Sequence, residues 1–359
     1  MKLVILGAGA SYDSNYELID NDSEQWKPPL GNKLFDTRQN FRAVINSYSG
    51  AKALSSDINA IEDIEDYFQS KWDFILKNRA DELLAKIINV QYYLQDLLYQ
   101  VSQNYSVSGL SNYDILMSRA YEYAIKNDED VCFVTFNYDT LLEKSFEKTF
   151  NTEIKNLDQY IDTPIKILKL HGSCNWYRAF NRSFMTFNHA ELSNQPEIAN
   201  FLYNKQFNLQ QIYDGLENEL VILNTPISRN LFDTTFGAQI TKCFFPQIMI
   251  PMKDKDEFVL PDEHYEYLTT NLQNINEILI IGWKGAEEHF QKLLYNRIGD
   301  KDITITHVNK DKTLEENLSP VLPKAAINHY LYDKDKDVAG TFTSYMKDVI
   351  NNRYVDFFN

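Results

Sequence analysis

Fully hydrophobic runs alternate along this chain with segments of helical spacing. Runs that are apolar at nearly every position are typical of strands buried on both faces of a parallel sheet. Four such runs are KLVIL at 2–6, VCFVTF at 131–136, IKILKL at 165–170 and EILIIGW at 277–283. DITITHVN at 302–309 is expected to be a further strand of the same sheet. We also expect strands of this sheet at QIMIP (247–251) and NHYLYD (328–333), and a separate strand at ELVILN (219–224).

Helical spacing covers most of the residues between 53 and 127. Hydrophobic residues recur there every three or four positions, in the segments 61–76, 80–101 and 113–125. The middle segment carries a seam with spacings of 4, 3, 4, 3 and 4, formed by Leu83, Ile87, Val90, Leu94, Leu97 and Val101. Such a seam suits a helix packed on its neighbours inside the domain, and a subunit interface is the alternative. Helices are also expected at 140–150, 286–298 and 337–354.

Strands joined by helical crossovers predict the fold class. We expect an α/β protein with a doubly wound, Rossmann-like parallel sheet and a large helical insertion. The predicted domain covers residues 1–310, with the helical insertion at about 53–127 and a second insertion, of little periodicity, at about 178–245. Residues 311–359 are expected to close the same domain with a strand and a helix.

Composition and charge restrict the function. Asp and Glu number 51 against 35 Lys and Arg, and the net charge of −16 disfavours direct binding of nucleic acid. No run approaches the roughly 18 apolar residues of a membrane-spanning helix, so we expect a cytoplasmic protein without membrane contact. Cys132, Cys174 and Cys243 form no CxxC pair, which excludes a disulfide framework and a four-thiolate zinc site.

Small and polar residues directly follow the predicted strands. In a parallel sheet the carboxyl ends of the strands lie at one edge, where loops and helix N-termini converge on ligands. The clusters expected at this edge are GAGAS at 7–11, NYD at 137–139, HGS at 171–173, GW at 282–283 and Asn309. Their common position predicts a single site.

Each cluster also has a purely structural explanation. GAGAS could be a tight strand-to-helix turn, since it lacks the third glycine of GxGxxG. Asn137 or Asp139 could cap the helix at 140–150. His171 could be a hydrogen-bonded histidine at a strand end, and GW a bend with a packed aromatic ring. These explanations do not predict that every cluster falls at the same end of one sheet.

Together the residues suit cleavage of a nicotinamide–ribose bond. Gly7 and Gly9 allow a pyrophosphate to approach the backbone, and Ser11 adds a donor at the start of a helix. His171 has a side chain suited to proton transfer near neutrality, and Asn137 can orient a hydroxyl or a water. The pyridine leaves as a neutral molecule, so the main need is to stabilise an oxocarbenium-like ribose. P-loop, HExxH and GxSxG motifs are absent from the sequence.

GAGAS, TFNYD (135–139), LHGS (170–173) and IIGW (280–283), in this order and spacing, resemble the sirtuin-like family. The resemblance covers about residues 1–310 and is closest to the divergent bacterial branch of NAD-cleaving effectors in anti-phage defence. PPLG at 28–31 is similar to the proline-containing cofactor loop of that family.

The resemblance implies roles for individual residues. Asn137 matches the residue that positions water and the nicotinamide ribose, Asp139 its acidic partner, and His171 the general base on the ribose hydroxyls. Asn309 would contact the adenosine ribose, and Gly282 would line the adenosine side. The remaining residues expected to bind NAD, as substrate, are Gly7, Ala8, Gly9, Ser11, Thr135, Phe136, Gly172, Ser173 and Trp283.

One departure from the family separates its branches. Deacylating sirtuins carry a zinc module with two CxxC pairs, and this chain cannot form one. The resemblance therefore implies NAD hydrolysis that depletes cellular NAD in abortive infection, without zinc or another metal. A protein deacylase, an ADP-ribosyltransferase and a non-catalytic subunit that binds NAD or ADP-ribose are the alternatives. Control of such an enzyme implies a homo-oligomer or a partner encoded nearby, a HerA-type hexameric ATPase in preference to a short Argonaute.

Overall fold

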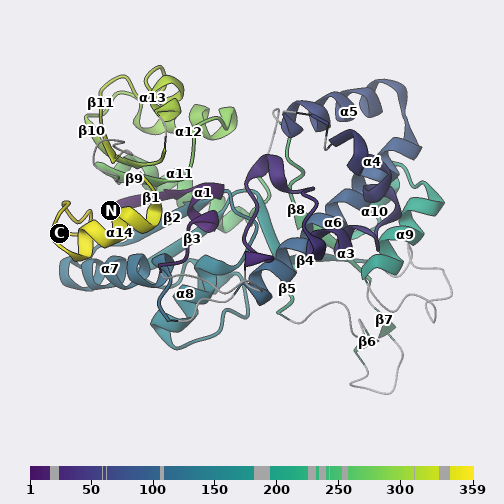
Figure 1. Cartoon of the computed structure of the whole chain (residues 1–359), viewed down its shortest axis with the longest axis horizontal. Coiled ribbons are helices and arrows are strands. Elements are labelled where there is room, and N and C mark those ends of the chain that lie inside the picture. Colours follow the sequence, from purple (N-terminus) through teal and green to yellow (C-terminus); the bar gives the residue numbers. More distant parts are fainter. Residues whose placement is uncertain are drawn as a thin grey trace. The chain divides into compact units, whose positions relative to one another are not determined.

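The structure is a computed structural model that divides the chain into two compact units (Figure 1). Unit 1 comprises residues 1–30, 105–171 and 254–359, and unit 2 comprises residues 31–104 and 172–253. The described residues are all those outside 17–23, 59, 62, 106–108, 182–194, 225–231, 234–239, 242, 253–257, 311 and 331–339.

Unit 1 is built on a six-stranded sheet in the order β11-β10-β9-β1-β2-β3. Every neighbouring pair is parallel. The strands are β1 (Lys2–Leu6), β2 (Val131–Thr135), β3 (Ile165–Lys169), β9 (Glu277–Ile281), β10 (Ile303–Val308) and β11 (Ala325–Tyr330). In chain order within the sheet this is the 3-2-1-4-5-6 arrangement of a doubly wound fold, with its switch point between β1 and β9. The predicted Rossmann-like parallel sheet is confirmed.

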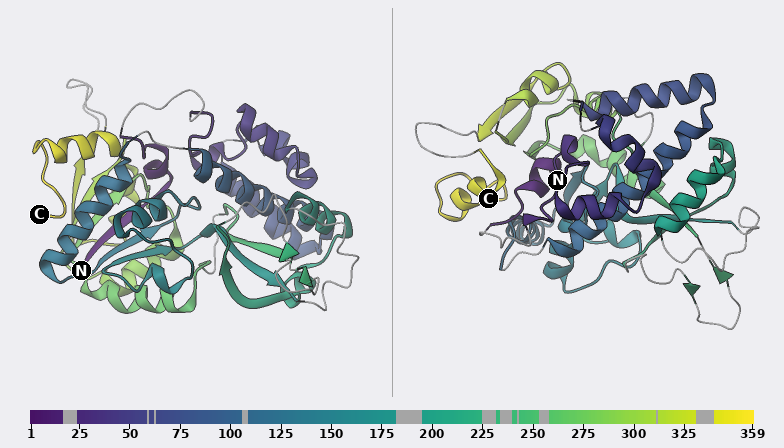
Figure 2. Two further views of the ribbon diagram at one scale, coloured as in Figure 1. Left: turned by 90° about the horizontal axis from the view of Figure 1, so that it is seen from below. Right: turned by 45° about the vertical axis from the view of Figure 1, so that its right-hand side comes forward.

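Helices cover both faces of this sheet. Leu3 and Ile5 of β1 face a hydrophobic core shared with Leu268, Phe290 and Leu294. Those residues come from α11 (Asp262–Asn271) and α12 (Glu288–Ile298), and α13 (Thr313–Leu318) joins the same core. The opposite face is covered by α7 (Asn112–Asn127) and α14 (Phe342–Ile350), as Figure 2 shows in its left view. Two covered faces explain why β1, β2, β3 and β9 are buried at successive positions, whereas β10 and β11 alternate more exposed with more buried residues.

The other elements of unit 1 are short or lie beside the sheet. They are α1 (Ala8–Tyr12), α8 (Leu141–Phe150), η2 (Asp158–Tyr160) and η4 (Leu272–Asn274). The helices α7, α8, α12 and α14 match segments that the hydrophobic spacing predicts, with bounds shifted by a few residues.

Unit 2 combines a helical layer with a three-stranded sheet in the order β5-β4-β8. Its strands are antiparallel: β4 (Gly172–Phe180), β5 (Leu216–Ile222) and β8 (Phe244–Ile248). The long helix α6 (Asp81–Asn104) packs on β4 and β8. The other elements are η1 (Gly31–Lys33), α3 (Gln39–Ile45), α4 (Ser49–Ile58), α5 (Ile64–Asn78), α9 (Gln195–Lys205), α10 (Leu209–Asp214), and the paired β6 (Phe232–Asp233) and β7 (Ile240–Thr241).

The seam predicted within 80–101 lies on α6. Its members Ile87, Val90, Leu94, Leu97 and Val101 are buried within this chain. The helix also contacts α3, α4, α5 and α9, all in unit 2. These contacts confirm the interpretation of a helix packed on its neighbours inside the chain.

The prediction for QIMIP is wrong. The strand there, β8, covers Phe244–Ile248 and pairs antiparallel to β4, outside the parallel sheet. Hydrophobicity reports that a strand is buried, but it does not report which partner the strand pairs with. The neighbouring strand β4 was not predicted, because GSCNWYRAF interrupts its apolar residues with Ser173, Asn175 and Arg178. Within the predicted second insertion, parts of 178–245 lie outside the described residues.

Candidate functional site

Three glycines meet at the switch point of the sheet in unit 1, and we call Gly7, Gly9 and Gly282 the glycine corner. Gly7 follows β1, and Gly282 follows the neighbouring β9 with φ of +64°. A Cβ atom on Gly282 would lie 2.4 Å from the backbone nitrogen of Ala10, and one on Gly7 would lie 2.5 Å from the carbonyl oxygen of Gly282. Only glycine allows the two turns to approach so closely.

Backbone hydrogen bonds join the two turns. Gly7 N–H donates to Ile281 O at 3.0 Å, and Gly9 N–H donates to Gly282 O at 3.2 Å. Gly282 N–H in turn donates to Val308 O at 3.0 Å, which places Asn309 next along the same edge. GAGAS is thus the tight strand-to-helix turn named above as its structural explanation. Contact of Gly7, Ala8 and Gly9 with a dinucleotide stays a prediction.

Asn137, Ser11 and Tyr113 form a buried polar cluster that we call the amide hub. Asn137 Nδ2 lies 2.9 Å from Gly7 O, 3.0 Å from Ser11 Oγ and 3.4 Å from Tyr113 Oη. Ser11 Oγ and Tyr113 Oη are 3.0 Å apart. The hub therefore connects the loop after β2 to the turn after β1 and to α7.

These contacts fix which end of the Asn137 amide faces away from the hub. Gly7 O can only accept a hydrogen bond, so the atom beside it must be the NH2 group. In the described part of the chain, Asn137 Oδ1 makes no hydrogen bond. Asn137 thus keeps its acceptor oxygen for another molecule, while its donors serve the protein.

Asp139 occupies the other end of the same loop. Its Oδ1 accepts a hydrogen bond of 3.1 Å from Leu141 N–H at the start of α8, whereas the N-cap residue of that helix is Thr140. The carboxylate also acts on the hub, because burial first and the charge of Asp139 second raise the pKa of Tyr113 well above its usual value. Tyr113 therefore stays protonated and can donate to Ser11.

His171 follows β3 and is only 4 % exposed. Its ring meets that of Phe136 edge-on, with centroids 5.0 Å apart, and it forms a parallel bridge with Val259. Phe136 directly precedes Asn137 in the chain. The fold of unit 1 therefore brings the segments that carry Asn137, Asp139 and His171 to the same edge of the sheet as the glycine corner.

An aromatic stack lies beneath these residues. The rings of Phe136 and Trp283 are stacked at 5.2 Å and 13°, and Phe290 packs edge-on against Phe136. Trp283 Nε1 donates to the carboxylate of Glu287. The aromatic residue after Gly282 is thus part of the core of unit 1, with 3 % of its surface exposed.

The remaining predicted residues have different positions. Thr135 ends β2, where its Oγ1 donates to Leu6 O and accepts from Asn137 N–H at 3.1 Å. Asn309 follows β10, and its Nδ2 is buried without a hydrogen-bond partner among the described residues. Gly172 and Ser173 begin β4 and belong to unit 2.

Sequence reasoning missed Tyr113, Lys169 and Glu143. Tyr113 appears in the sequence as one apolar position of a helix, and nothing marks its hydroxyl. Lys169 had a recognisable signal, because a charged residue interrupts the apolar run IKILKL directly before Leu170 and His171. Glu143 lies in the first turn of α8, where an acidic residue is common.

The three cysteines are not joined by disulfides. Cys132, Cys174 and Cys243 are all buried. Burial raises the pKa of Cys132 and of Cys243 to about 12. Among the described residues no group of three or more His, Cys, Asp or Glu side chains could hold a metal ion. No helix in the described ranges is long and apolar enough to cross a membrane.

The chain is similar in fold to solved Sir2 structures. One is a mutant of a Sir2 homologue in complex with ADP-ribose, with TM-score 0.37, 11 % identity and coverage of 99 % of this chain and 95 % of the other. Another is Sir2 with a p53 peptide and NAD+, with TM-score 0.37, 12 % identity and coverage of 98 % and 92 %. No family model matches the chain, and no curated protein sequence matches it significantly. Likeness at this level does not establish a family, so function is argued from this chain's own residues.

Proposed function

We propose that this protein is an NAD+ hydrolase that cleaves the nicotinamide–ribose bond to give nicotinamide and ADP-ribose. The observation that carries the proposal is the orientation of Asn137, which follows β2 and donates to Gly7 O at the switch point of a doubly wound sheet. Its Nδ2 is held by Gly7 O and Ser11 Oγ, and its Oδ1 is left as an acceptor. Nucleotides bind at this point of such sheets.

Asn137 Oδ1 supplies the negative end of a fixed dipole. Breaking the bond turns the ribose into an oxocarbenium-like cation, and a preorganised carbonyl oxygen stabilises it without reorganising. The same oxygen can accept a hydrogen bond from an attacking water and thereby orient it. Because three contacts immobilise the NH2 group, the orientation exists before substrate arrives.

His171 would carry out the proton transfers, and Asp139 would supply negative charge near the ribose. A neutral imidazole can accept a proton from a ribose hydroxyl or from water near neutral pH. The Asp139 carboxylate adds negative potential beside the developing cation. Asn309 would donate a hydrogen bond to a hydroxyl on the adenosine side. Its Nδ2 is buried without a partner among the described residues, and a hydrogen bond to a ligand oxygen would offset the cost of burying it.

The sequence resemblance extends the proposal to a cellular role. We propose that the enzyme is an effector of bacterial anti-phage defence that depletes NAD+ and is held inactive by oligomerisation or by a partner encoded nearby. The excess of 51 acidic over 35 basic residues is compatible with docking on a basic partner surface.

The test is direct. The purified chain, alone and with the product of the neighbouring gene, is incubated with NAD+, and nicotinamide and ADP-ribose are quantified by chromatography. We expect release in at least one condition and its loss in Asn137→Ala and in His171→Ala. His329→Ala is the matched control, since it removes a histidine from β11 at the far edge of the same sheet.

The alternatives give different outcomes. Release of nicotinamide only when an acylated peptide is added would indicate a deacylase, and labelling of a protein would indicate an ADP-ribosyltransferase. Binding of ADP-ribose without cleavage in either condition would indicate a non-catalytic subunit. Cleavage that survives both Asn137→Ala and His171→Ala would contradict the proposed site.

A further inference from the structure

Lys169 is a lysine buried completely inside unit 1, with 0 % of its side chain exposed. It is the last residue of β3, two positions before His171. Complete burial of an ammonium group is expensive unless its partners satisfy it. The contacts that satisfy this ammonium group therefore indicate what Lys169 does in the fold.

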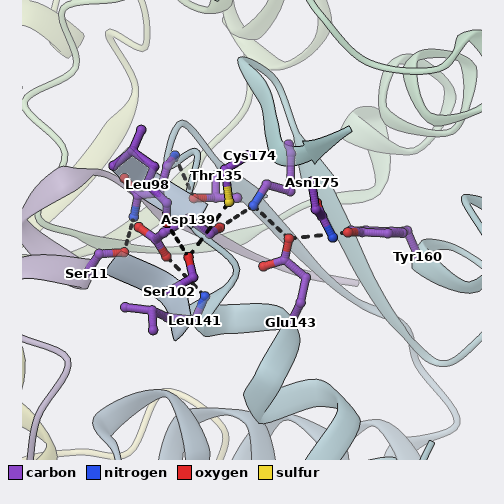
Figure 3. Close-up of polar contacts among 12 residues, drawn as sticks. Ser11, Leu98, Ser102, Thr135, Asp139, Leu141, Glu143, Tyr160, Cys174 and Asn175 are labelled. Carbon is purple, nitrogen blue, oxygen red and sulfur yellow. Dashed lines mark hydrogen bonds and ion pairs between the residues drawn. The ribbon is translucent and has the colours of Figure 1, made fainter. Parts of the chain in front are cut away.

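The contacts of Lys169 extend to the loop that carries Asn137. Its Nζ donates to the backbone carbonyl of Asp139, and it pairs with Glu143 Oε1 at 2.7 Å. Tyr160 donates to the same Glu143 oxygen at 3.3 Å, and Figure 3 shows Glu143 and Tyr160 meeting beside the segment with Asp139 and Leu141. One ammonium group thus joins the end of β3 to the loop between β2 and α8.

The Lys169–Glu143 pair is enclosed as a unit. The Glu143 side chain is 4 % exposed, and its Oε2 is buried without a partner among the described residues. Burial raises the pKa of Glu143, and the charge of Lys169 opposes that rise. At 2.7 Å, Glu143 is the acidic partner of Lys169 Nζ, and the other contact of Nζ is the neutral backbone carbonyl of Asp139.

We propose that Lys169 is a positioning residue that holds the loop 136–140 at a fixed spacing from His171. We call the hydrogen bond from Lys169 Nζ to the carbonyl of Asp139 the anchor. The part of the loop before Asp139 is held by two other hydrogen bonds, from Phe136 N–H to Leu6 O and from Asn137 Nδ2 to Gly7 O. Beyond Asn137, the contact from Lys169 ties the loop to the strand that leads into His171. The inference rests on the proposed function, since it assigns to Lys169 the alignment of the two groups proposed to act on the ribose.

The experiment compares two lysines of one strand. Lys169→Met removes the anchor. Lys166→Met is the matched control, because Lys166 is also buried in β3 and pairs with Asp130 at 3.3 Å at the opposite end of the strand. Lys169→Met/Glu143→Gln removes the anchor without leaving an unpaired carboxylate, and it replaces the single variant if that variant does not fold. Each full-length variant is measured for kcat, KM, thermal unfolding and amide hydrogen exchange.

In the Lys169 variants we expect faster exchange at residues 136–140 and a kcat lower by on the order of 10²-fold, the cost of misaligning reacting groups by about 1 Å. KM for NAD+ should change by less than about threefold, because the glycine corner remains intact. Lys166→Met should retain the wild-type exchange of this loop and the wild-type kcat. A loss confined to thermal stability and shared by both lysine variants is what a purely structural role would give.

Two results would overturn the proposal: unchanged exchange at 136–140 in the Lys169 variants, or equal changes in the Lys166 and Lys169 variants. A wild-type chain that never cleaves NAD+ would instead overturn the proposed function. The exchange comparison would then still decide whether Lys169 holds the loop.

Discussion

The glycine corner and the amide hub lie at the same edge of one sheet but are held together in opposite ways. At the corner, Gly7, Gly9 and Gly282 pack backbone against backbone, and any Cβ there would overlap main-chain atoms. At the hub, Asn137, Ser11 and Tyr113 are joined by side-chain hydrogen bonds. The two regions share Gly7, whose backbone forms part of the corner and whose carbonyl receives the Asn137 amide.

Because of this difference, the corner is expected to contribute mainly to the stability of the fold and the hub mainly to catalysis. A corner that consists of backbone cannot adjust when a side chain is added, because moving it shifts two strands. A hub that consists of side chains can lose one group and keep the fold, but it then loses the orientation of Asn137. Variants at the corner should therefore act on folding, and variants at the hub should act on turnover.

The largest effect is expected at the corner, in Gly282→Ala. The added Cβ would meet Ala10 N at 2.4 Å and Gly9 C at 2.5 Å, and the φ of +64° is unfavourable for alanine. The left-handed conformation and the overlap together should lower the free energy of unfolding by about 2–5 kcal/mol. Chemical denaturation followed by circular dichroism measures this loss, and a stability within 1 kcal/mol of wild type, roughly the scatter of surface variants, would contradict the packed corner.

The next effect is expected at the hub, in Asn137→Ala. Turnover of NAD+ should fall by about 10²–10³-fold, as for the removal of one preorganised group from an active site. Stability should fall by only about 1–3 kcal/mol, because Gly7 O loses the Asn137 donor but keeps the hydrogen bond from Ala10 N–H. Initial rates and denaturation of the same preparation separate the two effects. A variant that unfolds as readily as Gly282→Ala would remove the distinction between corner and hub.

Tyr113→Phe should have a smaller effect. It deletes only the hydroxyl and keeps the ring contact with Phe342, whose centroid lies 5.5 Å away. We expect kcat to fall by about 3–10-fold, as for one neutral hydrogen bond of about 1 kcal/mol.

The pH dependence of this variant is a further check. Burial raises the pKa of Tyr113 well above 10, so wild-type Tyr113 stays neutral throughout the range from pH 7 to pH 10. The ratio of wild-type to variant kcat should therefore be constant across that range. A ratio that approaches one as the pH rises to 10 would show that the hydroxyl ionises, contrary to its burial.

The smallest effect is expected in Gly31→Ala, the control for the corner. A Cβ on Gly31 would have no atom within 4 Å, and the residue lies in the short helix η1. The free energy of unfolding should change by no more than about 1 kcal/mol in either direction. A loss as large as that of Gly282→Ala would mean that alanine is poorly tolerated for reasons other than close backbone approach.

Much of unit 1 was predictable from the sequence. The runs at 2–6, 131–136, 165–170 and 277–283 form strands of the parallel sheet, because strands covered on both faces are apolar at successive positions. The segment 302–309 also contributes a strand, β10, to this sheet. The residues that follow them could be assigned to one edge for the same reason. The contact of Asp139 with the start of α8 follows from residues close in sequence, but the N-cap residue of that helix is Thr140, which the sequence analysis did not single out.

Unit 2 was much harder to predict. Its strand β4 mixes polar and apolar residues, and its pairing with β5 and β8 joins segments that are separated in the sequence. The run QIMIP was recognised as part of a strand but assigned to the wrong sheet. An antiparallel pairing of distant segments leaves no periodic signal that identifies the partner strand.

The sequence by itself determined the parallel strands, the polar residues at their carboxyl ends and the candidate chemistry of Asn137 and His171. Only the tertiary structure decided what those residues contact. It showed that Gly7 and Gly9 meet Gly282, that Tyr113 completes the hub and that Lys169 reaches the carbonyl of Asp139. Burial and periodicity are local properties of a chain, whereas these contacts join residues from 24 to more than 270 positions apart.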